Sequence, residues 1–226
     1  MNTITVKRAF QYRLYPTKGQ ADKLTWTLDR CRELYNAALE ERREAYRMCG
    51  VSVSYHDQKR QLPAIKEVRP EYKQIGSQVL QDVTARLDKA FRAFFRRAKG
   101  GVDPKKVGFP RFKGAYRYNS FTLSQVGWKL DALTGGSGHL YVAGIGHLKV
   151  TWSRPIVGKI KTVTIKRDAV QWSVTFSCEV EIEPAPLQDK PAVGIDMGLE
   201  YYASFQRDHN AALNILHRAG LARAVA

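Results

Sequence analysis

The sequence predicts an α+β protein in which a small β-barrel is interrupted by a helical block. Apolar and polar residues alternate near the N-terminus and again after residue 104, which is typical of half-buried strands. Between these regions apolar residues recur three, four or seven positions apart, as in amphipathic helices. A lone first strand needs partners to be stable. One barrel with a helical insertion is therefore favoured, and two independent domains are the alternative.

The first predicted strand covers residues 3–15, and the turn residues Pro16 and Gly19 end it. Its apolar face comprises Ile4, Val6, Phe10, Tyr12 and Leu14. A helix follows from Gln20 to about Met48, with Gly50 as a plausible stop. Its apolar stripe comprises Leu24, Leu28, Cys31, Tyr35, Ala38 and Ala45. Its other face carries Arg30, Arg32, Arg42, Arg43 and Arg47.

Two further helices and at least three strands are expected after this helix. The helices cover residues 55–66 and 75–98, and the second buries Leu80, Val83, Leu87, Phe91 and Phe94. The strands cover residues 147–152, 159–168 and 171–183. In the last, Trp172, Val174, Phe176, Cys178, Val180 and Ile182 share one face. We divide the chain into a first barrel strand (1–16), a helical block (17–101), the rest of the barrel (102–183), a proline-marked linker (184–191) and a C-terminal tail (192–226).

The charge of the chain favours a polyanionic partner. Lys and Arg number 37 against 21 acids, which gives a net charge of +16. Nucleic acid is the commonest partner of such a protein, and a merely well-solvated charged surface is the alternative. No apolar run is long enough to span a membrane, and the N-terminus lacks the apolar core of a signal peptide. We expect a cytoplasmic protein without a membrane partner.

The cysteines give no sign of a metal site. Cys31, Cys49 and Cys178 lie far apart, and no pair has the short spacing that brings two thiolates to one zinc ion. Cys31 and Cys178 fall on the apolar faces of their predicted elements. We expect both to be buried free thiols, and we expect no zinc.

Residues 105–114 form a stretch that mixes cations with aromatic rings, KKVGFPRFKG. Its candidate phosphate ligands are Lys105, Lys106, Arg111 and Lys113. Phe109 and Phe112 could stack on bases or pack beneath the loop. The basic helical faces, Arg42, Arg43 and Arg47 together with Arg92, Arg96 and Arg97, could bind phosphates or be merely solvated.

Two acids near the C-terminus suggest part of a nuclease site. Asp196 ends an apolar run between glycines, and an acid there is costly to bury without a cation. Asp208 opens a predicted helix and could equally cap it. Two-metal cleavage of a phosphodiester usually needs at least three carboxylates, and Glu200 lies in the wrong phase to join Asp196. The site therefore looks incomplete.

Six stretches make the whole chain resemble the TnpB family, transposon-encoded RNA-guided DNA endonucleases related to type V CRISPR effectors. They occur in family order: YRLYPTKGQ, CRELYNAAL, LDKAFRAFF, KVGFPRFK, VGIDMGLE and RDHNAALNIL. The resemblance implies a wedge-like β-barrel interrupted by a helical recognition insertion and followed by a RuvC nuclease domain of RNase H type. It also implies a prokaryotic protein that is associated with the nucleoid when it is on DNA.

The family's partners are a guide RNA from the transposon end and double-stranded target DNA beside a short adjacent motif. By this resemblance Tyr55, Gln81 and Thr122 occupy positions that contact the adjacent motif. Ser77, Gln78 and Leu123 occupy neighbouring positions and differ enough to imply a changed motif.

The resemblance also implies an internal deletion. Asp196 and Asp208 match the first and third RuvC acids, but only eleven residues separate them. The second acid, a glutamate, and the zinc ribbon should lie there, so residues 192–226 would be a truncated RuvC remnant. We expect magnesium, the family's cofactor, not to be bound productively, DNA not to be cut, and the truncated tail to allow self-association. The alternatives are an endonuclease with residual or intermolecularly completed activity, and a vestigial basic product that binds nucleic acid.

Overall fold

The computed structural model describes residues 3–101, 108–124, 126–131, 136–169 and 171–183. Thr3–Ile182 belong to one compact unit. Its strands are β1 (Ile4–Tyr15), β2 (Ser120–Leu123), β3 (Trp128–Leu130), β4 (Ser137–Val142), β5 (Gly146–Thr151), β6 (Lys159–Asp168) and β7 (Gln171–Ile182). Its helices are α1 (Lys18–Cys49), α2 (Tyr55–Val68), the short 3₁₀ helix η1 (Pro70–Gln74) and α3 (Ser77–Lys99). The described part of the chain therefore mixes helices with an antiparallel sheet, as expected.

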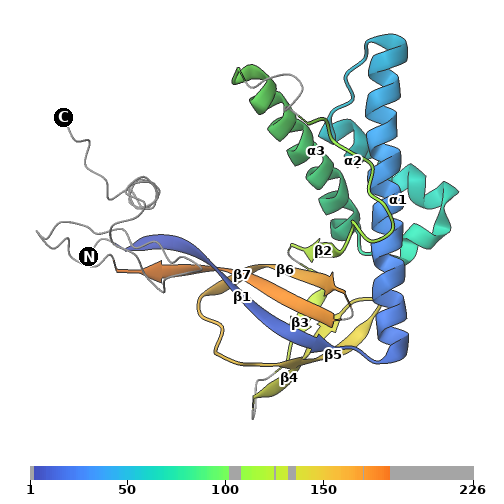
Figure 1. The fold of residues 1–226 in the computed structure, drawn as a ribbon. Coiled ribbons are helices and arrows are strands. Elements are labelled where there is room, and N and C mark those ends of the chain that lie inside the picture. Colours follow the sequence, from blue (N-terminus) through green and yellow to red (C-terminus); the bar gives the residue numbers. More distant parts are fainter. Residues whose placement is uncertain (1–2, 102–107, 125, 132–135, 170, 184–226) are drawn as a thin grey trace, which may run out of the picture. The chain divides into compact units, whose positions relative to one another are not determined.

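The strands form one seven-stranded sheet in the order β2-β6-β7-β1-β5-β4-β3. The sheet curls into a nearly closed barrel, with β1 crossing its middle (Figure 1). β1 pairs with β7 from Ile4 to Leu14 and with β5 from Arg13 to Tyr15. The first strand thus finds its partners after all the helices, which lie between β1 and β2 in the chain.

Local sequence signals begin and end the long first helix. The Thr17 hydroxyl accepts a hydrogen bond from the Gln20 backbone N–H, and the Gln20 side chain accepts one from the Thr17 N–H. This reciprocal cap satisfies two amides that the first turn leaves unpaired. Gly50 ends the helix in the left-handed conformation at φ 65°, which glycine adopts without strain. The Gln20 amide also donates to the His147 carbonyl at 2.9 Å and so joins α1 to β5.

The barrel interior is built from alternate residues of its strands. Those buried on β1, β6 and β7 are Phe10, Tyr12, Leu14, Val163, Ile165, Trp172, Val174, Phe176, Cys178 and Val180. The helices bury the predicted residues Leu24, Leu28, Cys31, Tyr35, Ala38, Leu80, Val83, Leu87 and Phe91, and also Leu34, Leu39, Leu62 and Val79, which were not predicted. Both sets follow the periods that the sequence shows, so periodicity alone predicted most of the core.

Four predictions of burial need correction. Ile4 is 46% exposed, because the end of β1 pairs with β7 alone. Ala45 and Phe94 are half-buried near the ends of their helices. Arg42 was placed on the solvent face, but it is buried between α2 and α3, where it bonds to Gln58 and Asp88. The short strands β2, β3 and β4 and the helix η1 were not predicted individually.

The three cysteines differ sharply in accessibility. Cys31 and Cys178 are buried and Cys49 is exposed, and all three are free thiols. Burial raises the pKa of the Cys31 thiol to about 12 and also raises the pKa of Cys178. The thiolate is the reactive form. Cys31 and Cys178 should therefore react slowly, because they are inaccessible to reagents and because their raised pKa keeps them protonated.

We therefore expect one rapidly reacting thiol in the native protein and three after denaturation. Titration with a chromogenic disulfide at pH 8 would measure both numbers. Replacing Cys49 by serine should remove the rapid phase. Rapid reaction of any thiol in the folded Cys49→Ser variant would contradict the burial of Cys31 or Cys178.

Within the described residues, no helix is both long and apolar enough to cross a lipid bilayer.

Candidate nucleic-acid interface

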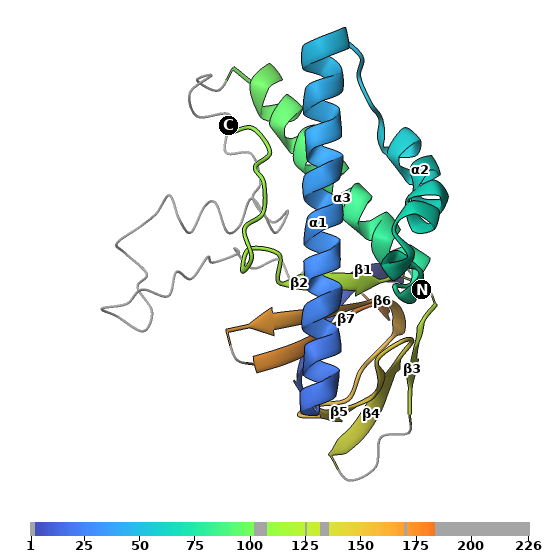
Figure 2. The same ribbon diagram turned by 90° about the vertical axis from the view of Figure 1, so that its right-hand side faces the viewer.

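Residues 108–119, here called the strap, lie along α1 and lead into β2 (Figure 2). The side chain of Asn36 on α1 holds the middle of the strap by two hydrogen bonds. Its amide donates to the Lys113 carbonyl at 3.0 Å, and its carbonyl oxygen accepts from the Lys113 backbone N–H at 2.8 Å. At the start of the strap, the Arg97 guanidinium donates to the Gly108 carbonyl at 3.2 Å. The strap is thus attached to both long helices.

The two phenylalanines of the strap have different surroundings. Phe109 packs edge-on against Phe91 and Phe94 of α3, with ring centroids 5.5 and 5.2 Å away. It therefore packs against the helix, although 44% of it stays exposed. Phe112 is 45% exposed, and the Arg43 guanidinium lies 5.5 Å from its ring centroid. Phe112 and Arg43 together offer a flat surface on which a base can stack.

The rest of the strap presents cations to solvent and buries one aromatic ring. Arg111 is exposed, and the Lys113 ammonium lies 5.7 Å from the centre of the Tyr35 ring. Tyr118 is buried near Tyr35, 6.0 Å between ring centroids, and burial raises its pKa. The strap therefore has an anchored end at β2 and a basic outer side.

The region that contains the strap is strongly positive. Residues 89–130 of the sequence hold eleven Lys or Arg residues and a single acid, Asp103. Clustered cations without balancing carboxylates attract phosphates and release counterions when phosphates bind.

The basic stripes of the helices prove heterogeneous. Arg42 is buried, Arg47 is paired with Glu44, and Arg92 lies 2.7 Å from Asp88. Arg43 reaches Glu44 only at 3.9 Å and leans over Phe112. Arg96 is exposed on the last turns of α3. Only some arginines of each predicted basic stripe are therefore available to bind a polyanion.

The predicted motif residue Thr122 lies on β2 with its hydroxyl engaged. It accepts a hydrogen bond from Arg86 of α3 at 2.8 Å and lies 3.1 Å from the Thr164 hydroxyl. Arg86 also donates to the Ser120 carbonyl at 2.7 Å and to Asp82 at 2.6 Å. Arg86 therefore fixes β2 against the N-terminal half of α3.

Gln78 strengthens the same junction. Its side-chain oxygen accepts hydrogen bonds from the Ser124 hydroxyl and the Val126 N–H, both at 3.1 Å. The sequence-predicted residues Gln78 and Thr122 are thus brought to one α3–β2 junction, to which Leu123 contributes a buried side chain.

Ser77 and Gln81 line a separate cavity of about 440 Å³ between α2, η1 and α3. Three lysines share this cavity, Lys59, Lys66 and Lys73. The Lys66 ammonium donates to the Ser77 hydroxyl at 2.7 Å, and Lys73 pairs with Glu67 at 3.0 Å. Tyr55 begins α2 and packs edge-on against His56, with ring centroids 5.2 Å apart.

The remaining predicted site residues lie outside the described part of the chain. These are Lys105, Lys106, Asp196 and Asp208. The predicted linker (184–191) and the predicted RuvC remnant (192–226) also lie outside it. Among the residues that the structure describes, no group of three or more His, Cys, Asp or Glu side chains could hold a metal ion.

Comparison with known proteins identifies the family. A family model described as a helix-turn-helix domain, HTH_OrfB_IS605, matches residues 1–50. A protein of Streptomyces pristinaespiralis named "Putative RNA-guided DNA endonuclease" is 34% identical over 200 residues, which is 86% of this chain. The chain belongs to the TnpB family.

A second TnpB relative is more distant. The "Putative RNA-guided DNA endonuclease InsQ" of Escherichia coli K12 is 26% identical over 199 residues. The chain covers 46% of each of these two relatives, so it spans about half their length. A solved Cas12f1–sgRNA–target DNA complex matches 96% of this chain at 12% identity with a TM-score of 0.44. The helix-turn-helix model covers a segment that, in this TnpB chain, consists of β1 and the single helix α1.

Sequence reasoning missed two residues that organise this TnpB surface, Asn36 and Arg86. The spacing of Asp82 and Arg86 indicates an ion pair within one helix, which the structure contains at 2.6 Å. No sequence signal links Arg86 to Thr122 or Asn36 to Lys113, because these partners are 36 and 77 residues apart.

We expect Asn36→Ala to release the strap. The Lys113 N–H and C=O would lose their partners, which costs about 1–3 kcal/mol when no water replaces them. Trypsin should then cut the native protein faster at Arg111, Lys113 or Arg117. The matched control is Asn119→Ala, because only the backbone carbonyl of Asn119 takes part in a described bond, from the Arg167 N–H. Equal cleavage rates for the two variants would show that Asn36 does not hold the strap.

Proposed function

We propose that this chain binds a guide RNA through the strap and the adjoining faces of α1 and α3. The observation that carries the proposal is the exposed pair of Arg43 on α1 and Phe112 on the strap, which Asn36 fixes. An anchored aromatic–guanidinium pair loses little conformational freedom when a base stacks on it. The relatives' names, RNA-guided DNA endonuclease, support an RNA partner.

The cations around this pair supply the affinity for the RNA backbone. Arg111, next to Phe112 in the chain, and Arg96, near the end of α3, are exposed, and no acid follows Asp88 in α3 or in the strap. Phosphate contacts of this kind are independent of sequence and weaken as salt rises. The RNA's shape and its unpaired bases then provide selectivity.

We further propose that the guide RNA directs the chain to double-stranded DNA beside a short motif. The cavity that contains Ser77 and Gln81 supports this, since its lysines suit the backbone of a duplex and its polar groups suit base edges. Arg86 and Gln78 keep Thr122 and the following loop in a fixed position against α3. Reading a motif requires such fixed geometry.

We propose that the chain does not cut DNA. The two acids that match RuvC residues, Asp196 and Asp208, are twelve positions apart, and the sequence offers no third acid in phase between them. Two metal ions that activate a nucleophile and stabilise the leaving oxygen need more ligands than these. The proposed activity is therefore guided binding without cleavage.

Titration of the purified chain with transposon-end RNA tests the first part of the proposal. We expect at least tenfold tighter binding than to random RNA of equal length at the same ionic strength. Phe112→Ala should weaken the specific complex about tenfold, since stacking on one aromatic ring is worth roughly 1–3 kcal/mol. Equal affinity for both RNAs would instead favour a vestigial basic protein.

A cleavage assay tests the second part. The chain, the RNA and a matched plasmid are incubated with and without magnesium, beside an Asp196→Ala variant. We expect no nicking above the Asp196→Ala background. Magnesium-dependent cutting that this variant abolishes would establish a completed nuclease site and overturn the proposal.

A further inference from the structure

A second polar hollow lies on the outer face of the barrel. Its volume is about 340 Å³, within the range of roughly 300–1,000 Å³ of pockets that take small organic molecules. Its walls come from β1, β7 and the end of β5, together with Ser153 and Asp168. β1 supplies Arg13 and Tyr15, the outward residues of the YRLYP stretch that supported the family resemblance.

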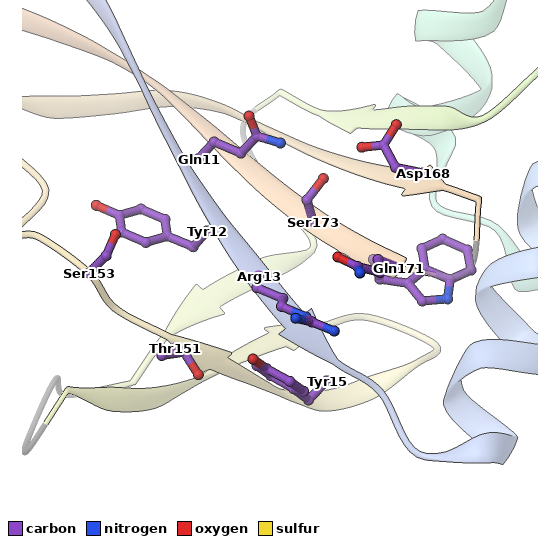
Figure 3. Close-up of a pocket in the computed structure, with 10 residues that line it drawn as sticks. Gln11, Tyr12, Arg13, Tyr15, Thr151, Ser153, Asp168, Gln171 and Ser173 are labelled. Atoms are coloured by element: carbon purple, nitrogen blue, oxygen red, sulfur yellow. The ribbon is translucent and has the colours of Figure 1, made fainter.

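Arg13 stands at the centre of this hollow. It is opposite Thr151 on β5 and opposite Ser173 on β7, so three strands meet at its position. Its guanidinium lies 5.1 Å from the centre of the Tyr15 ring, and Tyr15 is 44% exposed. Figure 3 shows Arg13 extending toward Gln171, whereas Tyr12 points to the other side of β1.

One polar atom in the hollow has an unmet hydrogen bond. The Ser173 hydroxyl is buried and has no hydrogen-bond partner among the described residues. A buried hydroxyl without a partner costs free energy. A ligand that supplies a donor or acceptor at Ser173 would recover it.

We propose that this hollow binds one unpaired nucleotide of a single-stranded nucleic acid. The base stacks on the Arg13–Tyr15 pair, Ser173 and Gln171 bond to its edge, and Arg13 also neutralises a neighbouring phosphate. Asp168, already paired with Lys166 at 2.5 Å, accepts from amino groups of the base and disfavours a phosphate at that end. This inference rests on the proposed RNA binding and adds to it a site on the barrel.

The test compares Arg13→Ala and Tyr15→Ala with Arg8→Ala in the full chain. Arg8 is exposed on the same strand but outside the hollow, so its replacement removes the same charge. We expect the two pocket variants to bind transposon-end RNA about tenfold more weakly and Arg8→Ala to stay within about twofold to threefold. The double variant should lose less than the product of the single losses, because both residues contact one nucleotide.

Single-stranded DNA of the same sequence identifies the source of the nucleotide. A loss confined to RNA assigns it to the guide, a loss confined to DNA assigns it to a displaced DNA strand, and equal losses show a pocket that accepts either nucleic acid. Pocket variants that match Arg8→Ala on both nucleic acids overturn the inference.

Photo-crosslinking of the wild-type chain separates this inference from the proposed function. The probe is a short single-stranded RNA that carries 5-iodouridine, and peptide mass spectrometry maps the adduct. Equal binding of transposon-end and random RNA would contradict the proposed function. An adduct at Tyr15 would support the pocket even in that case. Adducts confined to the strap, with none on β1, overturn the pocket while leaving the proposed function intact.

Discussion

Gly158→Ala is expected to destabilise the chain by about 3 kcal/mol or more. Gly158 precedes β6 with φ at 86°, a conformation that residues with a Cβ rarely adopt. An added Cβ would lie 2.3 Å from the Glu179 carbonyl oxygen and 2.8 Å from a methyl carbon of Val180. Backbone of β7 cannot move away without breaking its pairing with β1 and β6. Thermal or urea unfolding would measure the loss.

Gly114→Ala is the matched control for Gly158→Ala. Gly114 lies in the strap, and an added Cβ there meets no atom within 4 Å. We expect its unfolding free energy to stay within about 0.5 kcal/mol of the wild type. If Gly158→Ala were as stable as Gly114→Ala, this result would contradict the close contact between Gly158 and β7.

Arg42→Ala is expected to cost about 3 kcal/mol of stability without removing a nucleic-acid contact. Arg42 donates to the side-chain oxygen Oε1 of Gln58 at 2.9 Å and pairs with Asp88 at 3.4 Å, and its guanidinium lies 5.2 Å from the Phe91 ring centre. These contacts join α1 to α2 and α3. Its removal leaves Gln58 short of a donor in a buried site. Asp88 keeps Arg92 as a partner, which limits the cost.

The adjacent residue, Arg43, is expected to affect RNA binding and not stability. Arg43 is 49% exposed at its side chain and stands over Phe112. We expect Arg43→Ala to change stability by less than about 1 kcal/mol, to weaken RNA binding severalfold and to reduce the salt dependence of binding by about one charge. Unfolding and RNA titrations of both variants would show the contrast. A stable Arg42→Ala variant with weakened RNA binding would place Arg42 at the interface instead.

The two stability predictions concern residues that support the proposed RNA-binding surface. Gly158 permits β6 to pair with β7, and β6 in turn carries β2 at the edge of the sheet. β2 receives the end of the strap and holds Thr122 against Arg86. Arg42 joins α1 to α2 and α3. The proposed interface therefore depends on residues that do not contact nucleic acid.

Sequence alone determined the type and limits of the long elements, and its charge predicted a polyanionic partner. The buried residues of β1, α1, α3 and β7 recur at fixed local periods, and Thr17 and Gly50 mark the ends of α1 through their own chemistry. The excess of Lys and Arg over Asp and Glu can be counted without knowledge of the fold. These properties depend on neighbours in the chain, so a single sequence contains them.

Tertiary structure decided which distant groups meet. β1 pairs with strands more than 130 residues later, Asn36 holds Lys113, and Arg86 bonds to Thr122. Arg42, predicted to lie in a basic stripe, is buried and connects three helices, whereas the neighbouring Arg43 is exposed. Periodicity reports which face of an element is covered but not what covers it, because the covering group comes from another part of the chain. That is why the strap's anchor and the hollow around Arg13 emerged only from the folded molecule.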